Sequence, residues 1–164
     1  MALPNKVLPG FSAVLYAQPT STPTPLTTAQ LSLVASVAPI AVSGNVIPVE
    51  AIPAFGMDDA VASFGVAGSR QSDKIPVQAA PTSMTITAAW NPADTQLLLM
   101  RADAYSGVID RTFVISATDG TGIVYYAFNG RVGQFQIDSA PGAEAKATFT
   151  IHPRGNQYGW SNNA

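Results

Sequence analysis

Alternating apolar and polar residues along the chain predict a protein built mainly of β-strands. In each such segment every second residue is apolar, which is the pattern of a strand with one buried face. In the segment 82–90, for example, Met84, Ile86, Ala88 and Trp90 share one face. The predicted strands lie in the segments 12–18, 30–52, 82–90, 108–118, 123–128, 132–137 and 146–152.

Turn-forming residues decide how some of these segments are connected. The segment 30–52 contains Ser43-Gly44-Asn45, and we interpret it as a hairpin of two strands. Asn129-Gly130 is typical of either a tight turn or a β-bulge, so both remain open there. The resulting seven or eight strands and one helix favour a β-sandwich or barrel-like core with the helix packed at one side.

The helix is predicted at about residues 92–104, directly after the strand that ends at Trp90. Asn91 is the expected N-cap, Pro92 the first helical residue because it has no N–H to lose, and Asp94 an acid near the positive helix end. The apolar positions of the helix and strands predict a core made of Met84, Ile86, Trp90, Leu97, Phe113, Ile115, Phe149 and Ile151.

Residues 53–81 show little periodicity and are predicted to form a long loop. Loops longer than about 12 to 15 residues are uncommon in compact domains and are usually functional or disordered. This segment carries Phe55, Met57 and Phe64, which a solvated loop would not need. We therefore expect it to become ordered against another surface. The alternative is a short strand or helix that the pattern does not reveal.

The two ends of the chain are expected to lie outside the core of a single domain that spans residues 1–164. Residues 1–11 contain two prolines and a glycine, which disfavour helix and strand alike, so they are interpreted as an extended arm. Residues 153–164 are interpreted as a polar tail that holds Tyr158 and Trp160.

The composition changes this picture through its low charge. Only 11% of the residues are charged, 47% are hydrophobic, and the formal net charge is −2. The surface must be largely uncharged, so it is either an ordinary soluble surface or one that is buried against copies of the same chain. No basic run is present, which argues against a groove that grips nucleic acid through phosphate contacts.

The sequence offers no constellation of residues for catalysis, and we expect neither an enzyme nor a cofactor. His152 is the only histidine and cysteine is absent, which excludes multi-histidine and thiolate metal sites within one chain. Asp58-Asp59 is the only adjacent acidic pair, and it lacks the regular oxygen spacing of a calcium loop. No apolar run reaches the roughly 18 residues of a membrane span, so a soluble protein is expected.

The order of the motifs from about residue 45 to residue 155 resembles the major tail tube proteins of long-tailed, lambda-like bacteriophages. The matching features follow one another with the spacing of that family. They are Trp90-Asn91-Pro92 before a Leu-rich helix, Gly107 at the return, Phe113 to Thr118, Asp119-Gly120, a strand with Tyr126 and Phe128, Gly130-Arg131-Val132, and Lys146 to Ile151 with Gly155.

This resemblance implies a structural virion protein that is assembled in the host cytoplasm. Six copies would form a ring whose inner strands join into one continuous β-barrel, and the rings would stack into a tube through which linear DNA passes without specific binding. The tail tip or initiator, tape-measure and terminator proteins are implied as further partners. A DNA conduit favours a neutral or acidic lumen, and its strand-borne candidates are Glu50, Asp110 and Asp138.

In the family that the chain resembles, the arm 1–11 and the loop 53–81 cross to neighbouring rings. The aromatic residues of the C-terminal tail are further candidates for contacts between subunits. The expected contact residues are Leu3, Val7, Leu8, Phe11, Phe55, Met57, Phe64, Tyr158 and Trp160.

Two alternatives remain at this stage. A hexameric secretion-tube protein would have a similar fold and would stack its rings through shorter extensions. A monomeric β-sandwich binding module would instead use Tyr105, Tyr158 and Trp160 as an aromatic platform for a sugar or a protein.

Overall fold

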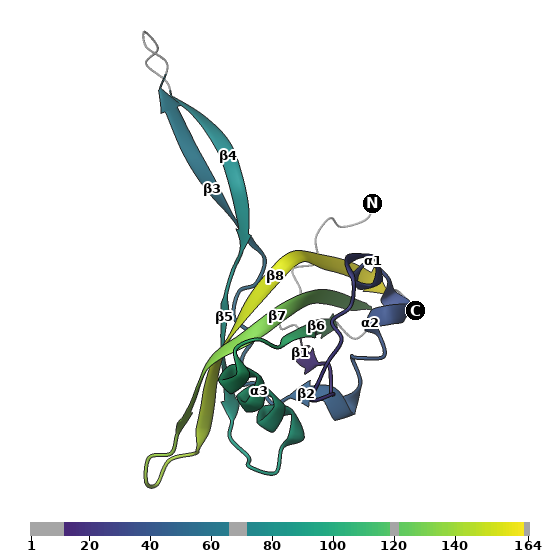
Figure 1. The fold of residues 1–164 in the computed structure, drawn as a ribbon, viewed down its shortest axis with the longest axis vertical. Helices are drawn as coiled ribbons and strands as arrows, with labels where there is room; N and C mark the ends of the chain where they lie inside the picture. The colour runs from purple at the N-terminus through teal and green to yellow at the C-terminus, as the bar shows by residue number, and fades with distance from the viewer. Residues whose placement is uncertain (1–11, 66–71, 119–121, 163–164) are drawn as a thin grey trace, which may run out of the picture.

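Six antiparallel strands curl into a half-barrel in the computed structural model, which describes residues 12–65, 72–118 and 122–162 (Figure 1). The strand order is β2-β1-β6-β7-β8-β5, and a separate hairpin is formed by β3 and β4. The fold is therefore mainly β, as predicted. The sheet strands are β1 Ser12–Ala17, β2 Val46–Ile47, β5 Met84–Ala89, β6 Asp110–Thr118, β7 Ile123–Asp138 and β8 Lys146–Asn162.

Both faces of the sheet are covered, and the larger core lies on the face that carries α3 (Thr95–Ser106). Leu97 and Met100 of α3 are fully buried there against strand residues. Trp90, predicted as a core residue, is only partly buried and packs edge-on against Phe135. The other predicted core residues are at most 1% exposed, namely Met84, Ile86, Leu97, Phe113, Ile115, Phe149 and Ile151.

Residues 46–50 join the two edges of the curled sheet. Val46 and Ile47 pair with Tyr16 and Leu15 of β1. Three residues after Ile47 the chain bonds to β5 at the other edge, where the Glu50 N–H donates to the Thr87 carbonyl at 2.9 Å. This short segment thus contains the edge strand β2 and bonds to the edge strand β5, which closes the half-barrel at that end.

The segment predicted as a strand before Ser43 is helical. It forms α1 Thr28–Leu31 and α2 Val34–Val37, followed by a 3-10 turn at Ser43–Asn45. Leu31 and Val37 are buried on the face of the sheet opposite α3, whereas Leu33, which alternation grouped with them, is 54% exposed. Thr27 and Gln30 close a capping box at the start of α1. When most residues of a segment are apolar, the two-residue period of a strand is hard to distinguish from the longer period of a helix. The capping box was the sequence signal that could have indicated the helix.

Helix α3 begins three residues later than predicted, because Asp94 and not Asn91 is its N-cap. The Asp94 carboxylate accepts the N–H groups of Gln96 and Leu97 at 2.9 and 3.1 Å. The Asn91 side chain accepts only the Ala93 N–H, within the turn before the helix. The helix ends at Gly107, whose φ of 67° is the left-handed conformation of a C-terminal cap.

Strands β7 and β8 are longer than predicted and contain two bulges. Asn129-Gly130 lies inside β7 beside a bulge, where both residues pair with β6 and β8. A side chain at position 130 would be crowded, because an added Cβ would stand 3.0 Å from a methyl carbon of Ile151. Residues 153–162, predicted as a polar tail, continue β8 and pair with β7. The register shifts between Ala127 and Asn129, opposite Gly155, and again near Gln134.

A buried ion pair fixes α3 to β6 and to the connection after β1. The Arg111 guanidinium binds both carboxylate oxygens of Asp103, at 2.6 and 2.9 Å, and donates to the carbonyls of Gln18 and Thr20. Both charged side chains are at most 1% exposed. The sequence shows these residues only as two isolated charges, and their pairing depends on how α3 meets β6.

Candidate assembly surface

A hairpin of strands β3 (Met57–Gly65) and β4 (Ser72–Pro81) projects away from the half-barrel (Figure 1). It occupies most of the segment that was predicted to be a loop. The strands pair in antiparallel register from Met57 and Pro81 to Gly65 and Ser72. The proline-containing sequence of β4 hides its period of two, which explains why the pattern did not reveal it. Within the described residues, no further strand pairs with either outer edge of this hairpin.

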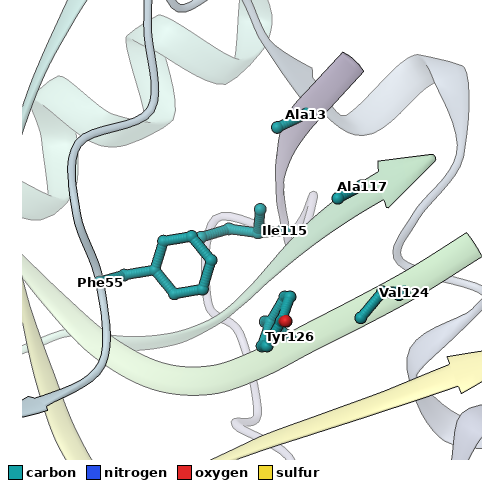
Figure 2. A pocket seen from close by; sticks show the side chains of 6 residues that line it. All are labelled: Ala13, Phe55, Ile115, Ala117, Val124 and Tyr126. Atoms are coloured by element: carbon teal, nitrogen blue, oxygen red, sulfur yellow. The ribbon is translucent and has the colours of Figure 1, made fainter. Parts of the chain in front are cut away.

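An apolar pocket lies where the chain leaves the sheet toward the hairpin (Figure 2). Its volume is about 220 Å³. The Phe55 ring packs edge-on against the Tyr126 ring, with 4.9 Å between their centroids. Among the labelled side chains only Tyr126 carries a polar atom, so the pocket suits the packing of an apolar side chain better than catalysis. The lining residues are Ala13, Phe55, Ile115, Ala117, Val124 and Tyr126.

Two of the three candidate lumen acids are engaged in ion pairs. Glu50 lies 2.7 Å from the Lys146 ammonium, which raises the pKa of Lys146. Asp138 is exposed at the end of β7 and stands opposite Lys146 in the strand register. Lys146 is thus the ion-pair partner of Glu50 and the strand-register partner of Asp138. Whether these acids face a lumen remains a prediction.

Asp110 belongs to a different charge cluster at the start of β6. It contacts Arg131 at 2.9 Å and Arg154 at 3.0 Å, and these three residues come from β6, β7 and β8. Partial burial raises the pKa of Asp110, but the hydrogen bonds and charges of the two arginines outweigh that effect and lower the pKa below its usual value.

The expected contact residues are only partly placed by the structure. Phe55 lines the pocket described above. Met57 and Phe64 lie on β3 and Tyr158 and Trp160 on β8, where only their backbone positions are described. Leu3, Val7, Leu8 and Phe11 lie outside the described residues. The roles of all these residues in contacts between subunits remain predictions.

Helix α3 and the residues just after it present apolar side chains to solvent, of which the sequence analysis named only Tyr105. Tyr105 is 75% exposed beneath the Arg101 guanidinium, Val108 is 71% exposed and Leu98 40%. The positions 98, 102 and 105 follow a helical spacing, which could have indicated this stripe. Of the proposed aromatic platform, Tyr105 lies on α3, whereas Tyr158 and Trp160 lie on β8 opposite Ala127 and Tyr125 of β7.

The described residues hold little that suggests catalysis. Among them, no group of three or more acidic, histidine or cysteine side chains is placed to hold a metal ion. The His152 ring instead shares a hydrogen bond of 2.9 Å with the Ser83 hydroxyl. None of the described helices has the length and apolarity that a membrane crossing needs.

Solved structures with this fold come from tail-like particles. No family model and no curated protein sequence matches the chain. A chain in the sheath/tube terminator structure of the PVC extracellular contractile injection system is 13% identical, with a TM-score of 0.64 over 97% of this chain and 99% of that chain. A chain in the anti-feeding prophage baseplate is 11% identical, with a TM-score of 0.65 over 98% and 97%.

The SPP1 tail tube also matches, with 11% identity and a TM-score of 0.54 over 93% of this chain and 77% of that chain. The chain therefore has the fold found in tube-like parts of phage tails and of phage-like injection systems. The likeness spans contractile and other particles, so it is broader than the lambda-like resemblance of the sequence.

Proposed function

We propose that the protein is a non-catalytic structural subunit that polymerises as stacked hexameric rings into the tube of a phage or phage-like particle. The observation that carries the proposal is the shared fold, which extends over nearly the whole chain in the PVC and anti-feeding prophage matches. In a phage the tube would be the conduit for linear DNA, and the tail tip, tape-measure and terminator proteins would be its partners.

The projecting hairpin supports assembly on physical grounds. A two-stranded hairpin without further contacts is marginally stable in water. The side chains of Val61, Ala62 and Ser63 are exposed, although Val61 is apolar. A partner surface would bury such positions and satisfy the open backbone edges, so the hairpin fits a role between subunits.

The charge distribution supports a conduit. The net charge is −2, and Glu50 and Asp110 are held in ion pairs. A weakly charged wall gives phosphates no cluster of free cations to bind, so DNA could slide along it.

A tube terminator is the second candidate, because one of the matching structures is that of a sheath/tube terminator. A tube subunit and a terminator differ in whether the contacts between stacked rings repeat. A tube subunit stacks without limit, whereas a terminator forms a single ring and caps a tube made of another protein.

Negative-stain microscopy and sedimentation of the purified protein test the proposal. A tube subunit gives rings and tubes of variable length as the concentration rises, and a terminator gives rings of one thickness. Protein that remains monomeric at high concentration, also after seeding, would overturn both functions.

Deletion variants locate the contacts. Replacing residues 57–81 by a short linker should leave the half-barrel folded, because β3 and β4 pair only with each other among the described strands. This variant, and one lacking residues 1–10, should retain the wild-type circular dichroism of the core and fail to stack. Normal tubes from both variants would show that the contacts lie elsewhere.

A further inference from the structure

Strand β8 has a long free edge. Its partner β5 pairs with it only from Lys146 to Ile151. On the opposite edge, β7 remains paired with β8 as far as Asn162. From Pro153 to Asn162, within the part of the chain that the structure describes, no strand pairs with the second edge. Residues 158–162 thus alternate between groups bonded to β7 and groups that face outward, whereas residues 155–157 form a bulge out of register with β7.

A fork in the sheet creates this edge. Ser83 and His152 are hydrogen-bonded at the point where β8 passes the start of β5. Beyond it, Gly155 takes a φ of 74° in a bulge, and β8 follows β7 toward α1 and α2, while β4 and the hairpin run the other way (Figure 1). Among the described residues, the hairpin of the same chain and β8 therefore belong to separate sheets.

The sequence of this edge lacks the usual protection. Natural edge strands are short or carry lysine, proline or inward-pointing charges that prevent pairing with another chain. Along this free edge such residues occur only at its start, as Pro153 and Arg154, and residues 155–162 contain no charged residue. A long, uncharged edge is expected to be paired in the working state of the protein.

Strand β3 of a second copy is the occupant that fits this edge best. It has nine residues, enough to span the regular part of this edge, and it is paired on one side only. It contains no proline, so every residue has an N–H to donate. Strand β4 is a poorer candidate because Pro76 and Pro81 lack this group.

We propose that β3 of one copy adds to the free edge of β8, residues 153–162, in a second copy. This proposal rests on the proposed self-assembly and names the contact. Main-chain hydrogen bonds would hold the two copies, as in other cases of strand addition. The donor and acceptor surfaces differ, so the contact is head-to-tail, and every copy can both give a hairpin and receive one.

Cysteine cross-linking tests the contact directly, because the natural chain contains no cysteine. Ala62→Cys lies at an exposed position of β3. It is combined in one chain with Gln157→Cys or with Ser161→Cys on β8. After mild oxidation of assembled protein, at least one combination should give a ladder of covalent oligomers that collapses on reduction. Ala62→Cys combined with Tyr105→Cys is the matched control and should give no ladder, because Tyr105 is exposed on α3.

Proline substitution gives a second readout. Neighbouring residues in a regular strand direct their N–H groups to opposite edges, and Tyr158 and Gly159 are consecutive partners of β7. Of Tyr158→Pro and Gly159→Pro, one therefore removes a bond to β7 and the other a donor of the free edge. The variant that keeps the wild-type melting temperature should be the one that lacks an N–H on the free edge. That variant should fail to assemble.

The outcomes separate this proposal from the proposed function. Tubes or rings that form without a β3–β8 ladder would overturn the strand addition and leave the tube function standing. A ladder equal to that of the Tyr105→Cys control, or normal assembly of the proline variant that melts like wild type, would also overturn it. Protein that forms neither rings nor tubes would contradict the tube function itself.

Discussion

Arg111 and Asp103 place two opposite charges in the interior at the junction of α3 and β6. A buried pair contributes little net stability compared with an apolar pair, but the loss of one partner leaves an uncompensated charge. Asp103→Ala should therefore lower the free energy of unfolding by about 3 to 5 kcal/mol. Chemical denaturation measures this change.

The double variant Asp103→Leu with Arg111→Met provides the control. It removes both charges, and it should be clearly more stable than Asp103→Ala alone. A double variant less stable than the single one would mean that the carbonyls of Gln18 and Thr20, which Arg111 also binds, account for most of the effect.

Asp110 predicts a pH dependence. Because Arg131 and Arg154 lower its pKa in the folded protein, the unfolded chain binds a proton at higher pH than the native one. The stabilisation is present above the unfolded value, near pH 4, and is lost as the pH falls through the lower folded value. Denaturant midpoints measured from pH 7 down to pH 2 should fall less steeply in the acid range for Asp110→Asn than for the natural chain. Identical slopes would contradict this linkage.

At the scale of the element, the start of α3 tests which residue is the cap. Asp94→Ala removes two hydrogen bonds to helix N–H groups and should cost about 1 kcal/mol of unfolding free energy. Asn91→Ala removes one bond within the preceding turn and should cost less. Thermal melting of the two variants decides, and a larger effect at Asn91 would restore the cap that the sequence favoured.

The sequence predicted helices and strands well where the apolar residues followed one clear period. It predicted them poorly where the apolar residues fitted both the strand period and the helix period. Strand β5 and the presence of α3 followed from clear alternation and a capped apolar run. The α1 and α2 region failed because Leu31, Leu33 and Val37 satisfy a two-residue period as well as a helical one. Only burial separates them, and burial depends on the opposite face of a sheet formed by distant strands.

For the candidate assembly surface, the sequence indicated the right segments but not their structure. Residues 53–81 were singled out by Phe55 and other apolar residues in a stretch without period, yet the hairpin was not predicted. The continuation of β8 past Pro153 was missed because proline and glycine are typical of a chain leaving a sheet. Here the proline lies on an edge and Gly155 in a bulge, positions that strands tolerate.

At the scale of the whole molecule, the low charge predicts weak binding to nucleic acid. With a net charge of −2 and no basic run, assembled protein should not retain duplex DNA in a mobility-shift or sedimentation assay at about 0.15 M salt. Glu50→Lys removes an acid, adds a cation and leaves Lys146 without its ion-pair partner. If Glu50 faces the lumen, assembled Glu50→Lys protein should retain more DNA than the natural protein does. Strong retention by the natural protein would contradict a passive conduit.

The segment 46–50 determines how the subunit would respond to a mechanical load. A pull on the hairpin enters the half-barrel through β5, which is bonded to β8 on one side and to residues 48–50 on the other. Over Thr87–Ala89 the strand is held along both edges, and this part cannot be peeled off one bond at a time, because its two ladders must slide past their partners together. Tension along the hairpin would thus be shared by the sheet as shear, and the subunit should separate from its neighbours before its own strands come apart.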